Sequence, residues 1–279
     1  MSISLDLRIS FCMQPIELPV FNPVALDLLQ MIEDPATDLD SIVQTINSDQ
    51  ALSAQVLKMA NSPAFAGLIR SETIKDSAVR LGTRQITNLV MAASQAALHT
   101  SPLPIIDDIM QDLWLHSHAC ALGCRILAQK TGHRDMSDQA YMAGLLHDIG
   151  KLYILKAMEE INHVDPSFEP ERDLILEIFS EMHVELGCRL MDHWNIPPVY
   201  RSIVANHHLA EADPQDVLLA IVRLVNINSR RLQLSLHHRS QAAIELLPPE
   251  ETLPIDEAAW VTLEETMRSA GKMPRERHS

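Results

Sequence analysis

Apolar residues recur at intervals of three and four along the first part of the chain, and this spacing restricts the fold more than any other feature of the sequence. Such intervals place side chains on one face of an α-helix. Asn22-Pro23 and Asp38 precede two of the stripes as helix starts, and Gly82 follows a later one as a stop. No alternation typical of a β-strand occurs in this half. The sequence therefore predicts an all-α fold, a multi-helix bundle of short helices joined by tight turns.

Ser101-Pro-Leu-Pro104 is the best candidate boundary between two halves of the chain. Beyond it, helical stripes are expected around Ile109 to Leu127, through a long helix ending near Trp194, and in a helix that starts at Asn195-Ile-Pro-Pro198. Another covers Val217 to Arg230. The tail from residue 236 is polar and rich in proline, and its Ala258 to Met267 stretch can form one short helix.

Composition limits the classes of protein that this chain can represent. With 279 residues, 47% of them hydrophobic, it is long enough to bury a core. A net charge of -15 argues against nucleic acid as a partner, because such binding depends on neutralising phosphates. There is no membrane span and no basic leader followed by an apolar stretch, so we expect a cytoplasmic protein. Cys120 and Cys124 lie one helical turn apart, which is more typical of small core residues than of a disulfide framework.

The segment Ala143-Gly-Leu-Leu-His-Asp-Ile-Gly-Lys151 places an adjacent His-Asp pair at the end of an apolar run. We expect one helix here, capped by Asp138 and ended by Gly150, with His147 and Asp148 on its last turn. An imidazole nitrogen and a carboxylate oxygen can ligate one divalent ion, and Lys151 can meet a phosphate. The alternative is that His147 caps the helix and Asp148 is a solvated acid.

The LLHDIGK run resembles the HD-domain superfamily of metal-dependent phosphohydrolases. In the first half, Leu18-Pro, Glu33-Asp-Pro, Leu57-Lys-Met-Ala-Asn-Ser62 and Ala78-Val-Arg-Leu-Gly82 are similar to HDOD domains, the "HD-related output domain" modules of bacterial signalling proteins. The resemblance implies an HDOD domain over residues 13–235, in which an N-terminal helical part (13–100) packs on an HD-like helical core (105–235). Residues 236–279 then form a C-terminal tail.

The resemblance also implies a metal site. Its candidate ligands are His116, His147, Asp148, His183, His207 and His208, with Asp112 as an outer carboxylate. Histidines with a carboxylate suit Fe, Mn, Zn, Co or Ni more than Mg or Ca. If the chain is an enzyme, Asp148 and Lys151 are its catalytic candidates. For His183 and His208 a second interpretation stays open, because a histidine on an apolar helix face is often a hydrogen-bonded core residue.

The chain departs from the superfamily at the last ligand, where Asn226 stands in place of an aspartate. A neutral amide holds a cation less well than a carboxylate. The loop after His208 also lacks the Gly-Tyr-Pro element of the HD-GYP phosphodiesterases, which argues against that activity. We therefore expect a signalling module without efficient phosphohydrolase activity that acts by binding a partner protein. The alternatives are a metal-dependent phosphohydrolase or phosphodiesterase acting on a nucleotide and, as a weaker one, a sensor of a metal or small ligand.

Overall fold

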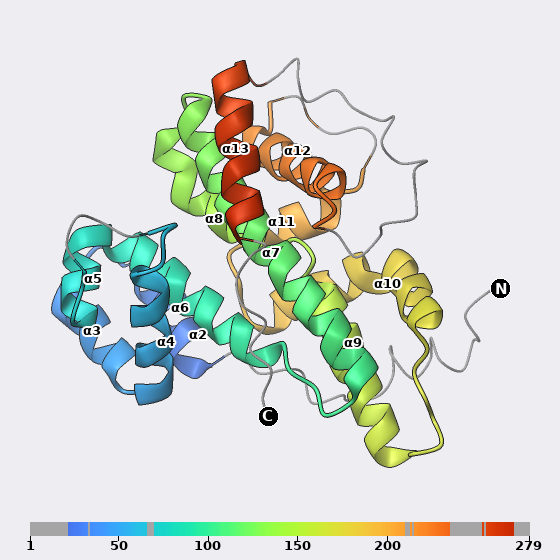
Figure 1. The fold of residues 1–279 in the computed structure, drawn as a ribbon. Coiled ribbons are helices and arrows are strands. Elements are labelled where there is room, and N and C mark those ends of the chain that lie inside the picture. Colours follow the sequence, from blue (N-terminus) through green and yellow to red (C-terminus); the bar gives the residue numbers. More distant parts are fainter. Residues whose placement is uncertain are drawn as a thin grey trace. The chain divides into compact units, whose positions relative to one another are not determined.

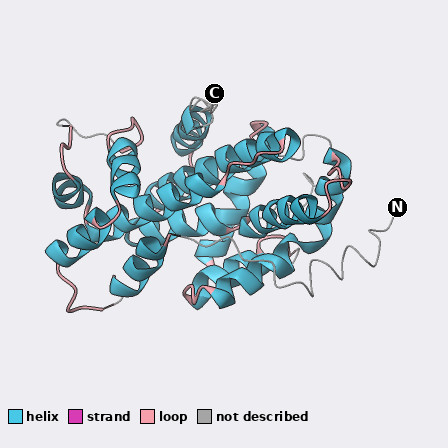
Figure 2. Ribbon diagram, turned by 90° about the horizontal axis from the view of Figure 1, so that it is seen from below, coloured by secondary structure: helices cyan, strands magenta, loops and turns pink. Residues whose placement is uncertain are grey.

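The computed structural model describes residues 22–32, 34–65, 70–209, 213, 215–234, 253 and 255–270. Every regular element in these ranges is helical (Figure 2), which confirms the all-α prediction. Among the described helices, none is both long and apolar enough to cross a membrane. Leu18, Pro19 and Glu33, on which part of the resemblance depends, lie outside the described residues, as does the tail from residue 236 to residue 252.

The chain divides into two compact units, one within Val20–Leu98 and the other from His99 onward. The expected domain bounds at residues 13 and 235 stay predictions. In the first unit, α6 contacts the other helices, and the side chains of Asn22 and Asp38 accept hydrogen bonds from the starts of α2 and α3 as expected. Its helices are α2 (Pro23–Met31), α3 (Leu39–Asn47), α4 (Gln50–Ala60), α5 (Ile74–Leu81) and α6 (Thr83–Leu98) (Figure 1).

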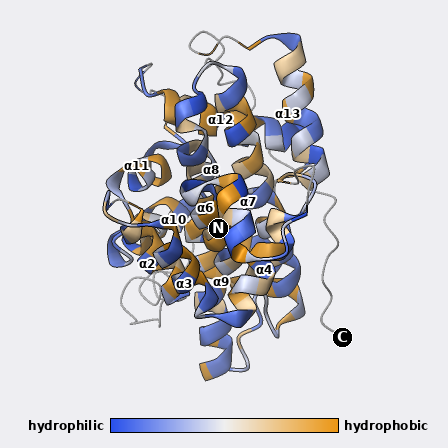
Figure 3. Ribbon diagram, turned by 90° about the vertical axis from the view of Figure 1, so that its left-hand side faces the viewer, coloured by the Kyte–Doolittle hydropathy of each residue, from blue (hydrophilic) through white to orange (hydrophobic). Residues whose placement is uncertain are grey.

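The second unit is organised around its longest helix, α7 (Pro104–Lys130), which contacts α8, α9, α12 and α13. The other helices are α8 (Ser137–Leu146), α9 (Ile149–Val164), α10 (Arg172–His193), α11 (Pro198–Asn206), α12 (Val217–Arg231) and α13 (Glu257–Ala270), with a 3-10 turn at Arg134–Met136. Helices such as α3 and α13 bury one apolar face against their neighbours, with polar residues on the other side (Figure 3). The central helices are enclosed further: residues 140–146 of α8 and 149–155 of α9 are all buried.

The structure corrects the predicted helix around the His-Asp pair. Asp138 does not cap it, because the 3-10 turn moves the start of α8 to Ser137 and leaves Asp138 in the first turn. The helix then ends at Leu146, and a separate helix, α9, begins at Ile149. His147 and Asp148 therefore form the junction between two helices. Gly150 is not a helix stop but lies within α9.

At Gly150 and Gly144, the backbones of neighbouring helices come close together. A Cβ atom on Gly150 would lie 1.8 Å from the carbonyl oxygen of His183 on α10. A Cβ atom on Gly144 would lie 2.7 Å from the carbonyl oxygen of Cys120 on α7. Real Cβ atoms do not approach backbone oxygens this closely, so only glycine permits both contacts. The two glycines thus set how near α9 lies to α10 and α8 to α7.

We predict that Gly150→Ala destabilises the protein by roughly 3 kcal/mol, the upper end of the range for overpacked cores. The backbone of α10 must move to admit the methyl group, which outweighs the gain in helix propensity of about 1 kcal/mol. Urea unfolding followed by circular dichroism measures the change. Gly123→Ala is the matched control, because there the Cβ would meet only side chains, those of Val225 and Met267. Equal stability changes for the two variants would contradict this account of Gly150.

Candidate metal centre

Four helices and one junction bring the candidate site residues together. His116 lies on α7, the junction between α8 and α9 supplies His147 and Asp148, and Lys151 follows in the first turn of α9. His183 lies on α10, and His207 and His208 follow the end of α11. Apart from His208, the side chains in this site are nearly inaccessible to solvent: His116, His147, Asp148, Lys151, His183 and His207 are buried.

The carboxylate of Asp148 is the centre of this arrangement, and its two oxygens face different partners. Oδ2 accepts a hydrogen bond of 2.6 Å from the Lys151 ammonium. The same oxygen lies 3.2 Å from Nε2 of His116 and 3.4 Å from Nε2 of His147. These two imidazole nitrogens are 3.3 Å apart. Oδ2 therefore already has a positively charged partner.

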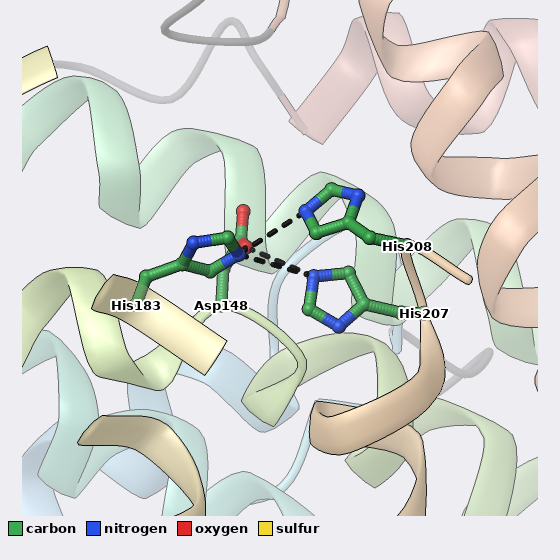
Figure 4. Close-up of side chains that lie close together, drawn as sticks. All are labelled: Asp148, His183, His207 and His208. Atoms are coloured by element: carbon green, nitrogen blue, oxygen red, sulfur yellow. Dashed lines mark hydrogen bonds and ion pairs between the residues drawn. The ribbon is translucent and has the colours of Figure 1, made fainter. Parts of the chain in front are cut away.

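The other oxygen, Oδ1, has no hydrogen-bond partner although it is buried. Nε2 of His183 lies 3.6 Å from it and Nε2 of His207 lies 3.5 Å from it. Nε2 of His208 is 3.1 Å from that of His183. Figure 4 shows these three imidazoles gathered around Asp148. Asp148, His183, His207 and His208, named here the α10–α11 cluster, offer ligand atoms that all lie within 4.8 Å of one another.

Backbone hydrogen bonds fix the tautomers of two histidines in this cluster. Nδ1 of His207 lies 2.9 Å from the carbonyl oxygen of Val204, and Nδ1 of His183 contacts that of Phe179. A carbonyl oxygen only accepts, so both Nδ1 atoms carry the hydrogen, and in the neutral ring Nε2 presents a lone pair. These lone pairs face Oδ1, which also needs a positive partner. Protein ligands to metals show the same support, with Nδ1–H bonded to a carbonyl and Nε2 on the ion.

Burial keeps the imidazoles of His183 and His207 neutral. It lowers the pKa of His183 to about 3, and it also lowers the pKa of His207. Burial also opposes ionisation of Asp148, but the Lys151 ammonium and His147 outweigh it and hold the pKa of that carboxyl well below its usual range. The cluster is thus an ionised carboxylate beside neutral nitrogen donors, which is the protonation state that a metal ion requires.

The spacing of these atoms fits a metal ion. Ligand atoms about 2.0–2.1 Å from one tetrahedral ion lie about 3.3 Å from each other. In the α10–α11 cluster, the distances from His183 Nε2 to Nε2 of His207, Nε2 of His208 and Oδ1 of Asp148 are 3.4, 3.1 and 3.6 Å. One cation between these atoms would satisfy both the orphaned Oδ1 and the convergent lone pairs. The donor set therefore fits a divalent transition metal.

The sequence also singled out Asp112 and Asn226, whose positions are as follows. Asp112 belongs to neither group of close ligand atoms; its Oδ2 lies 3.7 Å from Nη2 of Arg172, so the structure does not join it to the cluster. Asn226 is buried on α12, which packs against α7 and α8.

Cys120 is the residue that sequence reasoning missed. The sequence predicts a core residue, and Cys120 is buried, but its Sγ also lies 3.8 Å from Nδ1 and Nε2 of His116. His116, Cys120 and His147, named here the α7–α8 cluster, form a second group of ligand atoms within 4.8 Å of one another. The signal available in the sequence was the spacing of four residues between His116 and Cys120, which places both on one face of a helix.

Known proteins resemble this chain in sequence and in fold. A protein of Treponema pallidum (strain Nichols) is 29% identical over 224 residues, which make up 77% of this chain and 43% of that protein. The chain thus spans less than half the length of this relative.

Three solved structures share the fold at 19–20% identity. A candidate metal-dependent phosphohydrolase of Shewanella amazonensis SB2B has a TM-score of 0.75, covering 96% of this chain and 97% of that one. An HDOD domain protein of Geobacter sulfurreducens has a TM-score of 0.69 with the same coverage. A candidate signal transduction protein of Marinobacter aquaeolei VT8 has a TM-score of 0.65, covering 95% of this chain and 62% of that one.

The sequence profile of the HDOD domain matches residues 18–210, more than half of the chain. This match covers helices of the first unit and the segments that carry His116, His147, Asp148, His183, His207 and His208. The chain belongs to the HDOD domain family.

Proposed function

We propose that this protein is a metal-binding HDOD signalling module with little or no phosphohydrolase activity, which acts by binding a partner protein. The observation that carries the proposal is the buried Oδ1 of Asp148, which has no hydrogen-bond partner and faces the imidazoles of His183 and His207. A divalent transition metal (Fe, Mn, Zn, Co or Ni) held by the α10–α11 cluster would satisfy these groups. Mg and Ca prefer oxygen ligands and suit the cluster less.

The position of Lys151 argues for regulation rather than efficient catalysis. Its ammonium is bonded to Asp148 and its side chain is 8% exposed, so it is not directed at a phosphate from solvent. Asn226 also removes one negative charge that the superfamily provides for its metal. When bound, a metal would lower the pKa of a coordinated water and stabilise charge on a phosphate. In this chain Lys151 and Asp148, which would take part in that chemistry, are bonded to each other.

The site lies where a bound metal can affect packing. Its ligands come from α10, the end of α11 and the junction between α8 and α9. An ion bound to all of them joins helices that are otherwise held by side-chain contacts, so occupancy would stabilise one arrangement of this unit. A metal-dependent change in the stability of this unit is a means of regulating how it binds a partner protein. The likeness to a structure described as a candidate signal transduction protein is consistent with this role.

The alternative function is a metal-dependent phosphohydrolase or phosphodiesterase acting on a nucleotide. The observation in its favour is that His116, His147 and Asp148 stay within 3.4 Å of one another, as an intact His-Asp core would. A solved structure of the same fold is also described as a candidate metal-dependent phosphohydrolase.

A nucleotide panel separates the two functions. We predict no release of phosphate or nucleoside monophosphate above a chelated control when the protein is supplied with Mn or Fe. Release that requires the metal and disappears in Asp148→Ala would instead establish the phosphohydrolase. An assay by liquid chromatography of cyclic, linear and dinucleotide substrates covers both reaction types.

Metal binding should also appear as stability. We predict that saturating metal stabilises the folded protein by about 4 kcal/mol when the free metal exceeds its Kd a thousandfold. Chelation should reverse the change in melting temperature. The same titration on the double variant His183→Ala with His207→Ala is the control, since it removes two ligands of the α10–α11 cluster. An equal response of this variant would show that the metal stabilises the protein from elsewhere.

We predict that Lys151→Met destabilises the metal-free protein by about 3–5 kcal/mol, because it leaves the buried Asp148 carboxylate without its cationic partner. Lys156→Met is the control. The Lys156 ammonium also pairs with a carboxylate, that of Glu159, and donates a hydrogen bond to the carbonyl oxygen of Thr100, but in a more exposed position, so its loss should cost less, about 1–2 kcal/mol. Chemical denaturation after chelation measures both. The prediction fails if the two substitutions have the same cost.

A further inference from the structure

The α7–α8 cluster carries an inference that rests on the proposed metal-binding function and extends it. We propose that Cys120 is a metal ligand, and that together with His116 and His147 it forms a second site, which selects a thiophilic ion such as Zn or Co. The proposal begins with position: Cys120 follows His116 by one turn of α7, so their side chains lie on the same face of the helix.

Distances support the three-residue set. Sγ of Cys120 is 3.8 Å from both ring nitrogens of His116, and Nε2 of His116 is 3.3 Å from that of His147. For one tetrahedral ion with a sulfur ligand at about 2.3 Å and a nitrogen ligand at about 2.0 Å, the two ligand atoms lie about 3.6 Å apart. All three ligand atoms are within 4.8 Å of one another and all three residues are buried. Sγ therefore lies beside the His116 ring, and rotation of the Cys120 or His116 side chain brings it to an ion held by Nε2 of His116 and Nε2 of His147.

Gly144 explains how this spacing is reached. The absence of its side chain lets α8 meet the backbone of α7 at Cys120, where a Cβ would lie 2.7 Å from the carbonyl oxygen. The carbonyl of Gly144 in turn accepts a hydrogen bond of 2.8 Å from Nδ1 of His147. His147 therefore directs Nε2 toward His116. The contact that brings the two helices together also orients the second imidazole.

Charge gives the thiol a specific role. On this side of the site, Oδ2 of Asp148 is already bonded to the Lys151 ammonium. Two imidazoles beside a lysine ammonium would hold a divalent ion weakly. A Cys120 thiolate supplies the missing negative charge. Burial raises the pKa of the free thiol, so binding must displace the thiol proton, which leaves to solvent as the sulfur–metal bond forms.

Cobalt substitution tests the assignment directly. Purified chain is stripped with a chelator and loaded with Co(II) alone, and its near-ultraviolet absorption is compared in wild type, Cys120→Ser and Cys124→Ser. Cys124 is the matched control because it is also buried on α7, one turn further along. We expect a thiolate-to-cobalt charge-transfer band in wild type and Cys124→Ser that is lost in Cys120→Ser. Bound cobalt should fall by about one equivalent in Cys120→Ser, while its circular dichroism stays that of wild type.

Each contrary result has a distinct meaning. Bound cobalt without a charge-transfer band in wild type overturns the Cys120 site but leaves metal binding by the α10–α11 cluster intact. A band that persists in Cys120→Ser overturns the assignment of the ligand. If wild type binds no cobalt, both this site and the proposed metal-binding function are wrong. Should Cys120→Ser fold poorly, Cys120→Ala is measured in its place, with the same band and the same expected loss.

Discussion

The buried carboxylate of Asp148 is the constraint on which the second unit depends. A charge taken out of water is costly unless it is paired, so the surrounding helices must supply partners. Lys151, one turn away on α9, meets one oxygen. The other oxygen has no hydrogen-bond partner among the described residues and faces the imidazoles of His183 and His207, whose lone pairs need the same kind of partner. Four elements converge on the Asp148 carboxylate: α7, α9, α10 and the end of α11. Its Oδ2 has a charged partner, whereas its Oδ1 has no hydrogen-bond partner.

Helix packing makes this convergence attainable. The axes of neighbouring helices usually lie about 8–10 Å apart, at a distance set by the side chains between them. Gly144 and Gly150 shorten the distance at the two places where the ligands need it, one beside Cys120 and one beside His183. The site therefore depends on residues that contribute no ligand atom.

Much of this could be predicted from the sequence, because local signals decide local structure. Asn22 and Asp38 cap their helices as their chemistry indicates, and the apolar stripes are the buried faces. The break between α8 and α9 could not be predicted. In a sequence, Gly150 is typical of a helix end, and only the structure shows that it is a glycine because the backbone of α10 lies where its side chain would be. The places of Asp112 and Cys120 relative to the site could not be predicted for a related reason. Spacing along α7 places both near His116, and only the packing of α8 and α10 decides which one joins the site.

The central claim is that the histidines around Asp148 in this HDOD protein hold a metal. The most direct measurement is elemental analysis of protein purified without a metal-binding affinity tag, with Asp148→Ala prepared alongside it. The account predicts about one or two equivalents of a transition metal in wild type, since the ligands form two clusters around one carboxylate, and a loss of metal in the variant. Absence of metal from both proteins, even after incubation with each candidate ion, would contradict the account and leave the cluster as an element of the helical core.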